Sequence, residues 1–380
     1  MQERSQRIDI LRGVAILMVM QMHMIQSSPV MHEIGVPVLL IVWLRYGWGG
    51  VDFFFVISAY LLTLNLLRHR KDDHFIRVFY LRRALRILPL YWIFLAAGFL
   101  TGALWLSGGG SADFWLWKDQ EPAHVYLLFL QSWIIGWRGQ PIGEFYGPTW
   151  SLAVEETFYL ILPLALYWLK PRQVGIVAAC LIAAAPLVRL AFFHSPIPGA
   201  SYIWIFAHMD AFGWGVLLAI MREYRADLLT MISARTGAIA AVCLTALVAP
   251  LATGLDKSTD WLLGTSIFAM GGAFAVSAAI HPVGSISKNT PWAGRFLAWC
   301  GVRCYSLYLF HLPILGLTYV AAGGLNPYVK ADASALLVAV AILLTFGFAA
   351  LTYRFIELPC MALAARWTPY QPRSGKAAEG

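Results

Sequence analysis

Ten apolar segments of membrane-spanning length run through this sequence, and they constrain its fold more than any other feature. A helix needs about 20 mostly apolar residues to cross a bilayer core of about 30 Å. The segments are 10–28, 48–67, 88–106, 149–169, 174–193, 203–221, 237–253, 261–280, 305–322 and 334–353. The chain is 59% hydrophobic and only 13% charged, whereas a soluble domain is about half apolar and a quarter charged. The sequence therefore predicts an all-α polytopic membrane protein with about ten transmembrane helices.

An eleventh apolar stretch, 123–137, cannot be assigned by its length alone. Cytoplasmic loops are enriched in Lys and Arg. Most of the 28 Lys and Arg residues fall on one side of the membrane if 123–137 does not cross. Counting it as a crossing inverts every later segment and scatters the positive charge. We therefore predict ten crossings, a short re-entrant or interfacial helix at 123–137, and both termini on the cytoplasmic side.

The loops are short, so we expect one transmembrane domain over residues 1–367 and a short disordered cytoplasmic tail over 368–380. The net charge of +8 does not indicate nucleic-acid binding, because the basic residues alternate with apolar segments embedded in the lipid bilayer. The five cysteines predict neither a disulfide framework nor a metal site. No permanently bound cofactor is expected, and the sequence is compatible with a homo-oligomer.

Two ionisable residues, Arg12 and His23, lie within the first apolar segment. They are eleven positions apart, which is three helical turns and about 20° more, so they share one helix face. At 1.5 Å per residue they stand about 16 Å apart along the axis. Ionisable residues inside a membrane are costly and commonly functional. The pair predicts a fixed cation near the cytoplasmic face and a titratable base toward the outer face.

Further ionisable residues are expected at the depth of His23. With the predicted topology, Asp52, Glu155, His208 and Asp210 all lie toward the outer ends of their segments. A base with carboxylates nearby is the usual equipment for taking a proton from a hydroxyl. The alternative is that each is an interfacial residue satisfied by water or by a tyrosine. Several segments placing ionisable groups at one depth favours a site.

On the cytoplasmic side, Arg82, Arg83 and Arg86 precede Pro89 at the start of an apolar segment. Arginine forks suit phosphate oxygens, so we predict that this cluster binds a phosphorylated ligand. The positive-inside rule and anionic lipid head groups are the alternatives. His311, about two turns into its segment from the cytoplasmic side, is assigned to the same donor-binding side.

Six motifs, in this order, resemble the acyltransferase family 3 of integral membrane acyltransferases. They are RIDILRGVAILMVMQMH (7–23), GGVDFFFVISAYLL (49–62), RRALRILPLYW (82–92), WSLAVEETFY (150–159), YSLYLFHLP (305–313) and RFIELP (354–359). The family O-acylates cell-surface sugars, lipopolysaccharide, exopolysaccharide and some antibiotics. Where the family usually has glycine after the serine of the second motif, this chain has Ala59, which we expect to change packing only.

The resemblance implies ten core transmembrane helices with cytoplasmic termini, in a bacterial inner membrane. It implies an acyl-CoA donor, usually acetyl-CoA, on the cytoplasmic side. The acceptor at the outer face would be a carbohydrate or glycolipid, for example in a surface polysaccharide or lipopolysaccharide. Carried over by position, the essential arginine and histidine of the family are Arg12 and His23, and its motif glutamate is Glu155.

The mechanism expected from these residues is general base catalysis by His23. Asp52 or Glu155 would orient the imidazole and stabilise its charged form, as the carboxylate of a Ser-His-Asp triad does. Direct transfer and an acyl-histidine intermediate both remain open. Trp150 is predicted to stack on the acceptor, although an interfacial aromatic belt would also place it there. A proton-coupled transporter, with His23, Asp52 and Glu155 as a proton relay, is the alternative function.

Overall fold

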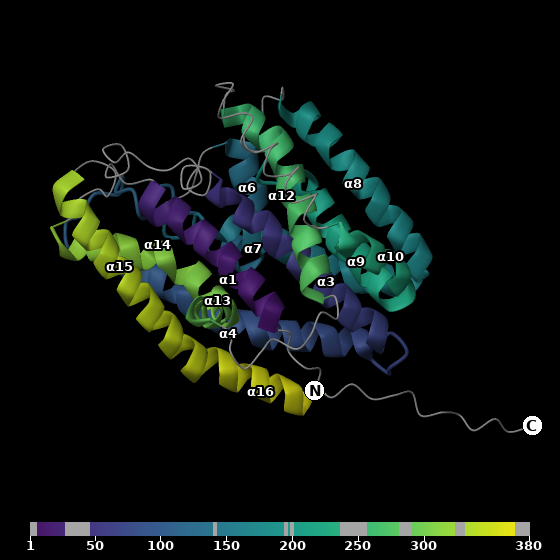
Figure 1. Cartoon of the computed structure of the whole chain (residues 1–380). Helices are drawn as coiled ribbons and strands as arrows, with labels where there is room; N and C mark the ends of the chain where they lie inside the picture. The colour runs from purple at the N-terminus through teal and green to yellow at the C-terminus, as the bar shows by residue number, and fades with distance from the viewer. Residues whose placement is uncertain are drawn as a thin grey trace, which may run out of the picture.

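The computed structural model describes residues 6–26, 46–139, 143–193, 197, 201–235, 257–280, 291–323 and 331–368. Within these ranges the chain is all-helical, without a strand (Figure 1). The elements are α1 (Gln6–Gln21), η1 (Met22–Gln26), η3 (Gly47–Gly49), α3 (Gly50–His69), α4 (Phe75–Ser107), α5 (Ala123–Leu127), α6 (Gln131–Arg138), α7 (Thr149–Trp168), α8 (Pro171–Phe193), η4 (Ile205–His208), α9 (Met209–Tyr224), α10 (Ala226–Ala234), α12 (Lys257–Ile280), α13 (Trp292–Val302), α14 (Cys304–Ala321), α15 (Ala331–Thr352), η5 (Tyr353–Glu357) and α16 (Leu358–Trp367).

Seven helical stretches of the described chain are long and apolar enough to cross a membrane. They are Gly47–His69, Phe75–Ser107, Pro171–Phe193, Ile205–Tyr224, Leu262–Ile280, Cys304–Ala321 and Ala335–Trp367, and each overlaps a predicted segment. The predicted segments 10–28 and 149–169 fall on α1 and α7, which contain charged residues and are not among the seven. The segment 237–253 lies outside the described residues, as does the tail beyond Thr368. The multi-pass helical architecture is confirmed, and the count of ten stays a prediction.

The stretch 123–137 does not form one helix. It contains α5, of 5 residues, and α6, of 8 residues, separated by a break at Phe129, whose φ is +55°. An eight-residue helix is about 12 Å long, well short of a bilayer core of about 30 Å. Where we predicted one short helix, the structure therefore has two, and neither is long enough to cross.

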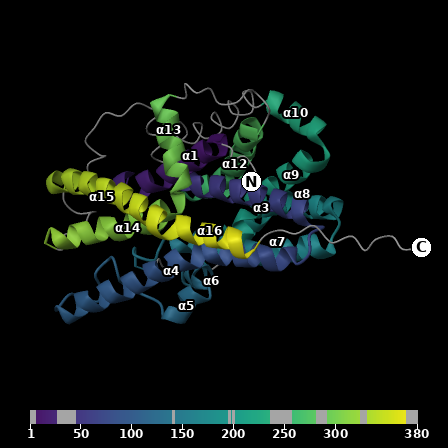
Figure 2. The ribbon, with the colours of Figure 1, turned by 90° about the horizontal axis from the view of Figure 1, so that it is seen from below.

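Burial separates central from peripheral helices. Of the apolar window in Gly47–His69, 72% is buried, against 17% in Pro171–Phe193 and 28% in Ala335–Trp367. Thus α3 lies inside the bundle, while α8 and the α15–α16 pair lie at opposite edges (Figure 1). Seen from below, α4 runs along one side of the bundle together with α5 and α6 (Figure 2). The exposed leucines and aromatic residues of the edge helices suit contact with lipid.

Glycines bring α1 close to its neighbours. A Cβ on Gly13 would stand 2.0 Å from the carbonyl oxygen of Leu297, and one on Gly301 would stand 1.8 Å from that of Asp9. Only glycine permits this approach between α1 and α13, as small residues commonly do at helix interfaces in membranes. The part of α1 that carries Arg12 is therefore packed closely against α13.

Candidate active site

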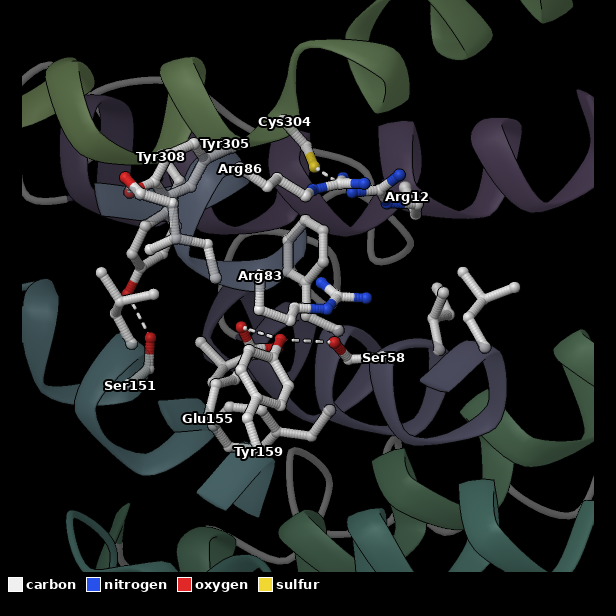
Figure 3. Close-up of a pocket in the computed structure, with 17 residues that line it drawn as sticks. Arg12, Ser58, Arg83, Arg86, Ser151, Glu155, Tyr159, Cys304, Tyr305 and Tyr308 are labelled. Atoms are coloured by element: carbon white, nitrogen blue, oxygen red, sulfur yellow. Dashed lines mark hydrogen bonds between the residues drawn. The ribbon is translucent and has the colours of Figure 1, made fainter. Parts of the chain in front are cut away.

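A pocket between α1, α3, α4, α7 and α14 holds four of the predicted residues, Arg12, Arg83, Arg86 and Glu155 (Figure 3). It has about 880 Å³ of empty space and is open at its mouth. Its lining combines polar and aromatic side chains with an apolar wall. The residues are Arg12, Val51, Phe54, Phe55, Ile57, Ser58, Leu61, Arg83, Arg86, Ile87, Ser151, Leu152, Glu155, Tyr159, Cys304, Tyr305 and Tyr308. We call it the arginine pocket.

The charge of this pocket is positive, because its wall has three guanidinium groups and one carboxylate, that of Glu155. Arg12 comes from α1, and its Nη2 donates to the Cys304 thiol at 3.1 Å. Arg83 and Arg86 are one turn apart on α4, and Arg83 lies over the ring of Tyr159, 5.1 Å from its centre. The excess of positive charge fits an anionic ligand with several oxygen atoms.

Arg82 does not line the arginine pocket. Its Nε and Nη2 donate to the carbonyl of Thr368, at 3.0 and 2.7 Å, and so tie α4 to the end of α16. Arg83 and Arg86, which are three positions apart, face the cavity. Arg82 is four positions from Arg86 but does not face the cavity. The three arginines predicted as one cluster therefore divide between a pocket and a helix contact.

Glu155 lies on the arginine side of the site and not beside His23. The hydroxyl of Tyr159 donates to its Oε2 at 2.9 Å, and the hydroxyl of Ser58 donates in turn to Tyr159 at 2.7 Å (Figure 3). The charge of Arg83 also acts on Glu155. The partners of this carboxylate are thus a hydroxyl chain and a guanidinium, which differs from the predicted pairing with the imidazole.

His23 is paired instead with His311. It lies in the π-helical turn η1, which continues α1, and such turns are frequent at functional sites. Its Nδ1 is 3.0 Å from Nε2 of His311, whose own Nδ1 is 2.7 Å from the carbonyl oxygen of Tyr308. His311 is fully buried. The sequence placed His311 on the donor side, whereas the structure places it against the predicted base.

The two hydrogen bonds assign the tautomers of both rings. A carbonyl oxygen only accepts, so Nδ1 of His311 must donate to Tyr308. Nε2 of a neutral His311 is then an acceptor, and Nδ1–H of His23 donates to it. In this tautomer the lone pair of the His23 ring is on Nε2. His311 therefore takes the orienting position that we had predicted for Asp52 or Glu155.

His23 opens into a second pocket, of about 630 Å³ of empty space, which we call the histidine pocket. It lies beside the loop that precedes α7. Its lining residues are His23, Ile135, Gly139, Glu144, Gly147, Pro148, Trp150 and Ile203. The predicted acceptor-side residue Trp150 is thus brought together with the predicted base.

Asp52 and His208 lie behind Trp150, in the protein interior. Both side chains are fully buried, and Nδ1 of His208 is 2.8 Å from Oδ1 of Asp52. The other ring nitrogen donates to the carbonyl of Tyr202 at 2.5 Å. Both ring nitrogens of His208 are thus engaged inside the protein, and His208 lines neither pocket. Its ring stacks on Trp150 at a centroid distance of 5.6 Å, so this pair supports the tryptophan.

Asp210 belongs to a buried ion pair that the sequence did not predict. Arg189 of α8 donates from Nη1 and Nη2 to the two carboxylate oxygens, at 3.2 and 2.8 Å. Ser266 of α12 also donates to Oδ2, at 2.7 Å. The network joins α8, α9 and α12, and Asp210 lines neither pocket. An arginine inside an apolar segment was the signal that could have indicated it.

Hydrogen bonds join the walls of the two pockets, and we call the residues that make them, Ser151, Tyr308 and Pro148, the partition. Ser151 and Tyr308 line the arginine pocket at the end away from Arg12 (Figure 3), and Pro148 lines the histidine pocket. The Tyr308 hydroxyl donates to the carbonyl of Pro148. It accepts from Ser151, with the two oxygens 2.5 Å apart. Tyr308 therefore has two roles: its hydroxyl belongs to the partition, and its backbone carbonyl accepts a hydrogen bond from Nδ1 of His311.

Comparison with known families supports an acyltransferase. The profile of the Acyl_transf_3 family, described as an acyltransferase domain, matches residues 5–354. The chain is 24% identical over 376 residues to the peptidoglycan O-acetyltransferase OatA of Listeria monocytogenes, covering 93% of this chain and 55% of that protein. It is 26% identical over 346 residues to a Bacillus subtilis protein named "Putative peptidoglycan O-acetyltransferase YrhL", covering 83% and 51%. The chain thus spans about half the length of these relatives. No solved structure matches it.

Proposed function

We propose, from the premise that this chain belongs to the acyltransferase 3 family, that it moves an acyl group from acyl-CoA to a sugar hydroxyl. The donor would be cytoplasmic, with acetyl-CoA as the default, and the acceptor would lie at the outer face. The observation that carries the proposal is that α1 and its continuation η1 place an arginine and a histidine in two different pockets. Arg12 lines a cationic pocket, and His23, about 16 Å along the helix axis, lines a second pocket.

The arginine pocket is suited to the donor. Coenzyme A presents phosphates and a narrow pantetheine arm, and Arg12, Arg83 and Arg86 provide forked donors for phosphate oxygens. Ile87, Leu152 and the other apolar lining residues would contact the arm. The thioester would then have to pass the Ser151–Tyr308 partition to reach His23. Binding both substrates in adjoining pockets supplies the proximity that transfer needs.

The chemistry proposed for His23 follows from its tautomer. Nε2 takes the proton from the acceptor hydroxyl, and the hydroxyl oxygen attacks the thioester carbonyl. The carbon–sulfur bond breaks, and the CoA thiolate leaves and is protonated by the imidazolium. While the ring is charged, its Nδ1–H remains bonded to Nε2 of His311, which disperses the charge. An acylated His23 is the variant that trapping in donor-only reactions would reveal.

The acceptor class is proposed from the histidine pocket and from the relatives. Trp150 offers an aromatic face beside the base, and aromatic rings suit the apolar faces of sugars. OatA is named a peptidoglycan O-acetyltransferase, so a glycan of the cell surface is the acceptor that we propose to test first.

The experiment is an acyl-transfer assay on the purified protein in lipid nanodiscs. With labelled acetyl-CoA and N-acetylglucosamine oligosaccharides, we expect CoA release to rise on acceptor addition and label to appear on the sugar as an ester. Arg83→Ala should raise the KM for acetyl-CoA, whereas Arg82→Ala, whose guanidinium bonds to Thr368, should leave it unchanged. Solute movement across proteoliposomes without CoA release would instead support the transporter.

A further inference from the structure

A carboxylate that the sequence did not single out, Glu144, lies in the histidine pocket. It belongs to the loop 143–148 that leads into α7. Its backbone N–H donates to the carbonyl of Trp115 at 3.2 Å, and that of Phe145 donates to Leu116 at 3.0 Å. A Cβ on Gly143 would stand 2.7 Å from the Leu116 carbonyl oxygen. Two backbone hydrogen bonds therefore hold the loop at Glu144 and Phe145, and Gly143 packs closely against Leu116.

The Glu144 carboxylate has no hydrogen-bond or ion-pair partner among the described residues. By contrast, the carboxylate of Glu121 pairs with Arg138. Burial raises the pKa of the Glu144 carboxyl above its ordinary value. A half-buried carboxylate without a partner is costly. The cost is relieved when a ligand with hydrogen-bond donors occupies the pocket.

The groups that surround the histidine pocket together with this carboxylate indicate which class of ligand fits. Its Oε2 would be 3.7 Å from a Cβ on Gly147, which lines the same pocket. His23 and Trp150 line that pocket as well. A base, an aromatic face and an acceptor-only carboxylate thus surround one cavity. A pyranoside has a matching group for each of the three. One hydroxyl can react at the base, the apolar ring face can stack on the aromatic side chain, and the other hydroxyls can donate hydrogen bonds to the carboxylate.

We infer that Glu144 is an acceptor-binding residue, which accepts hydrogen bonds from non-reacting hydroxyls of a pyranoside stacked on Trp150. This inference rests on the proposed acyl transfer and names a residue that binds its acceptor substrate. Glu144 holds the sugar so that one hydroxyl meets Nε2 of His23. It takes no part in donor binding, because it does not line the arginine pocket.

The test measures acyl transfer from acetyl-CoA to methyl β-glucopyranoside and to its monodeoxy analogues. For Glu144→Gln, kcat/KM for the glucoside should fall about 5- to 10-fold, since the amide oxygen still accepts but the bond to a charged group becomes a neutral one. The change should appear in the acceptor KM, with the KM for acetyl-CoA unchanged. Wild type should discriminate against at least one deoxy analogue, and Glu144→Gln should discriminate against the same analogue less strongly. Asp113→Asn, at an exposed loop carboxylate, is the matched control and should behave as wild type.

Three results would overturn this inference. If wild type is active and Glu144→Gln has the same kcat and acceptor KM, the carboxylate has no role in acceptor binding. A Glu144→Gln variant that loses kcat while keeping its acceptor KM would make Glu144 part of the proton transfer. A wild type that releases CoA but acetylates neither the glucoside nor its analogues would exclude the pyranoside. If wild type consumes no acetyl-CoA with any acceptor, the proposed function itself fails, and this outcome is distinct from the other three.

Discussion

Replacing His311 with alanine is expected to slow acyl transfer without weakening donor binding. The structure places Nε2 of His311 at 3.0 Å from Nδ1 of His23 and fixes its ring through the Tyr308 carbonyl at 2.7 Å. Alanine removes the acceptor for Nδ1–H of His23. The imidazolium that forms during transfer then loses a hydrogen bond, and the ring of His23 is free to adopt the other tautomer.

The size of the effect follows from that lost bond. A hydrogen bond to a charged group contributes about 1.5–3 kcal/mol, which corresponds to a fall in kcat of about 10- to 150-fold. Loss of the correct tautomer adds to this figure. His311→Gln should retain more activity, because its amide oxygen can still accept from His23. The KM for acetyl-CoA should change by less than about threefold in both variants.

The assay is steady-state acyl transfer at saturating acceptor, with the acetyl-CoA concentration varied. Thermal unfolding in detergent serves as the control for folding, since His311 is fully buried. An alanine variant that keeps the wild-type kcat and raises the KM for acetyl-CoA would refute the reasoning. That result would return His311 to the donor-binding role that its sequence position predicted.

Three further predictions concern other parts of the site. Arg86→Ala should raise the KM for acetyl-CoA about tenfold, by loss of a charge-assisted contact to phosphate; an unchanged KM would remove Arg86 from the donor site. Tyr308→Phe removes the hydroxyl that bonds to Ser151 and Pro148. It should raise the rate at which CoA is released without acceptor about 2- to 10-fold. Release at the wild-type rate would mean that this hydroxyl does not close the partition. Asp210→Ala should destabilise the protein by about 3–5 kcal/mol, because it leaves a buried guanidinium without its carboxylate; denaturation that matches wild type would contradict this.

The sequence could predict the helical architecture because apolar length is a local property. The segments 48–67 and 88–106 each fall within one of the helices that can span a membrane. The shared face of Arg12 and His23 was also predictable, since both lie on one helix. The division of 123–137 into two short helices depends on the positive φ of Phe129, for which apolar periodicity gives no signal.

The pairing of side chains between helices could not be predicted, because it depends on how the helices rotate about their axes. Depth in the membrane alone placed Asp52 and Glu155 near His23, yet packing turns them toward His208 and Tyr159. The same argument by depth placed His311 on the donor side. Glu144 was missed because a single glutamate in a loop has no distinguishing pattern until the pocket around it is known.

The most direct test of the account is the rate of acyl transfer by a His23→Ala variant, measured with labelled acetyl-CoA and an acceptor sugar. General base catalysis contributes about 10²- to 10⁴-fold, so the account predicts a loss in kcat of at least about 100-fold in a folded variant that still binds acetyl-CoA. Transfer by His23→Ala at the wild-type rate would contradict the central claim.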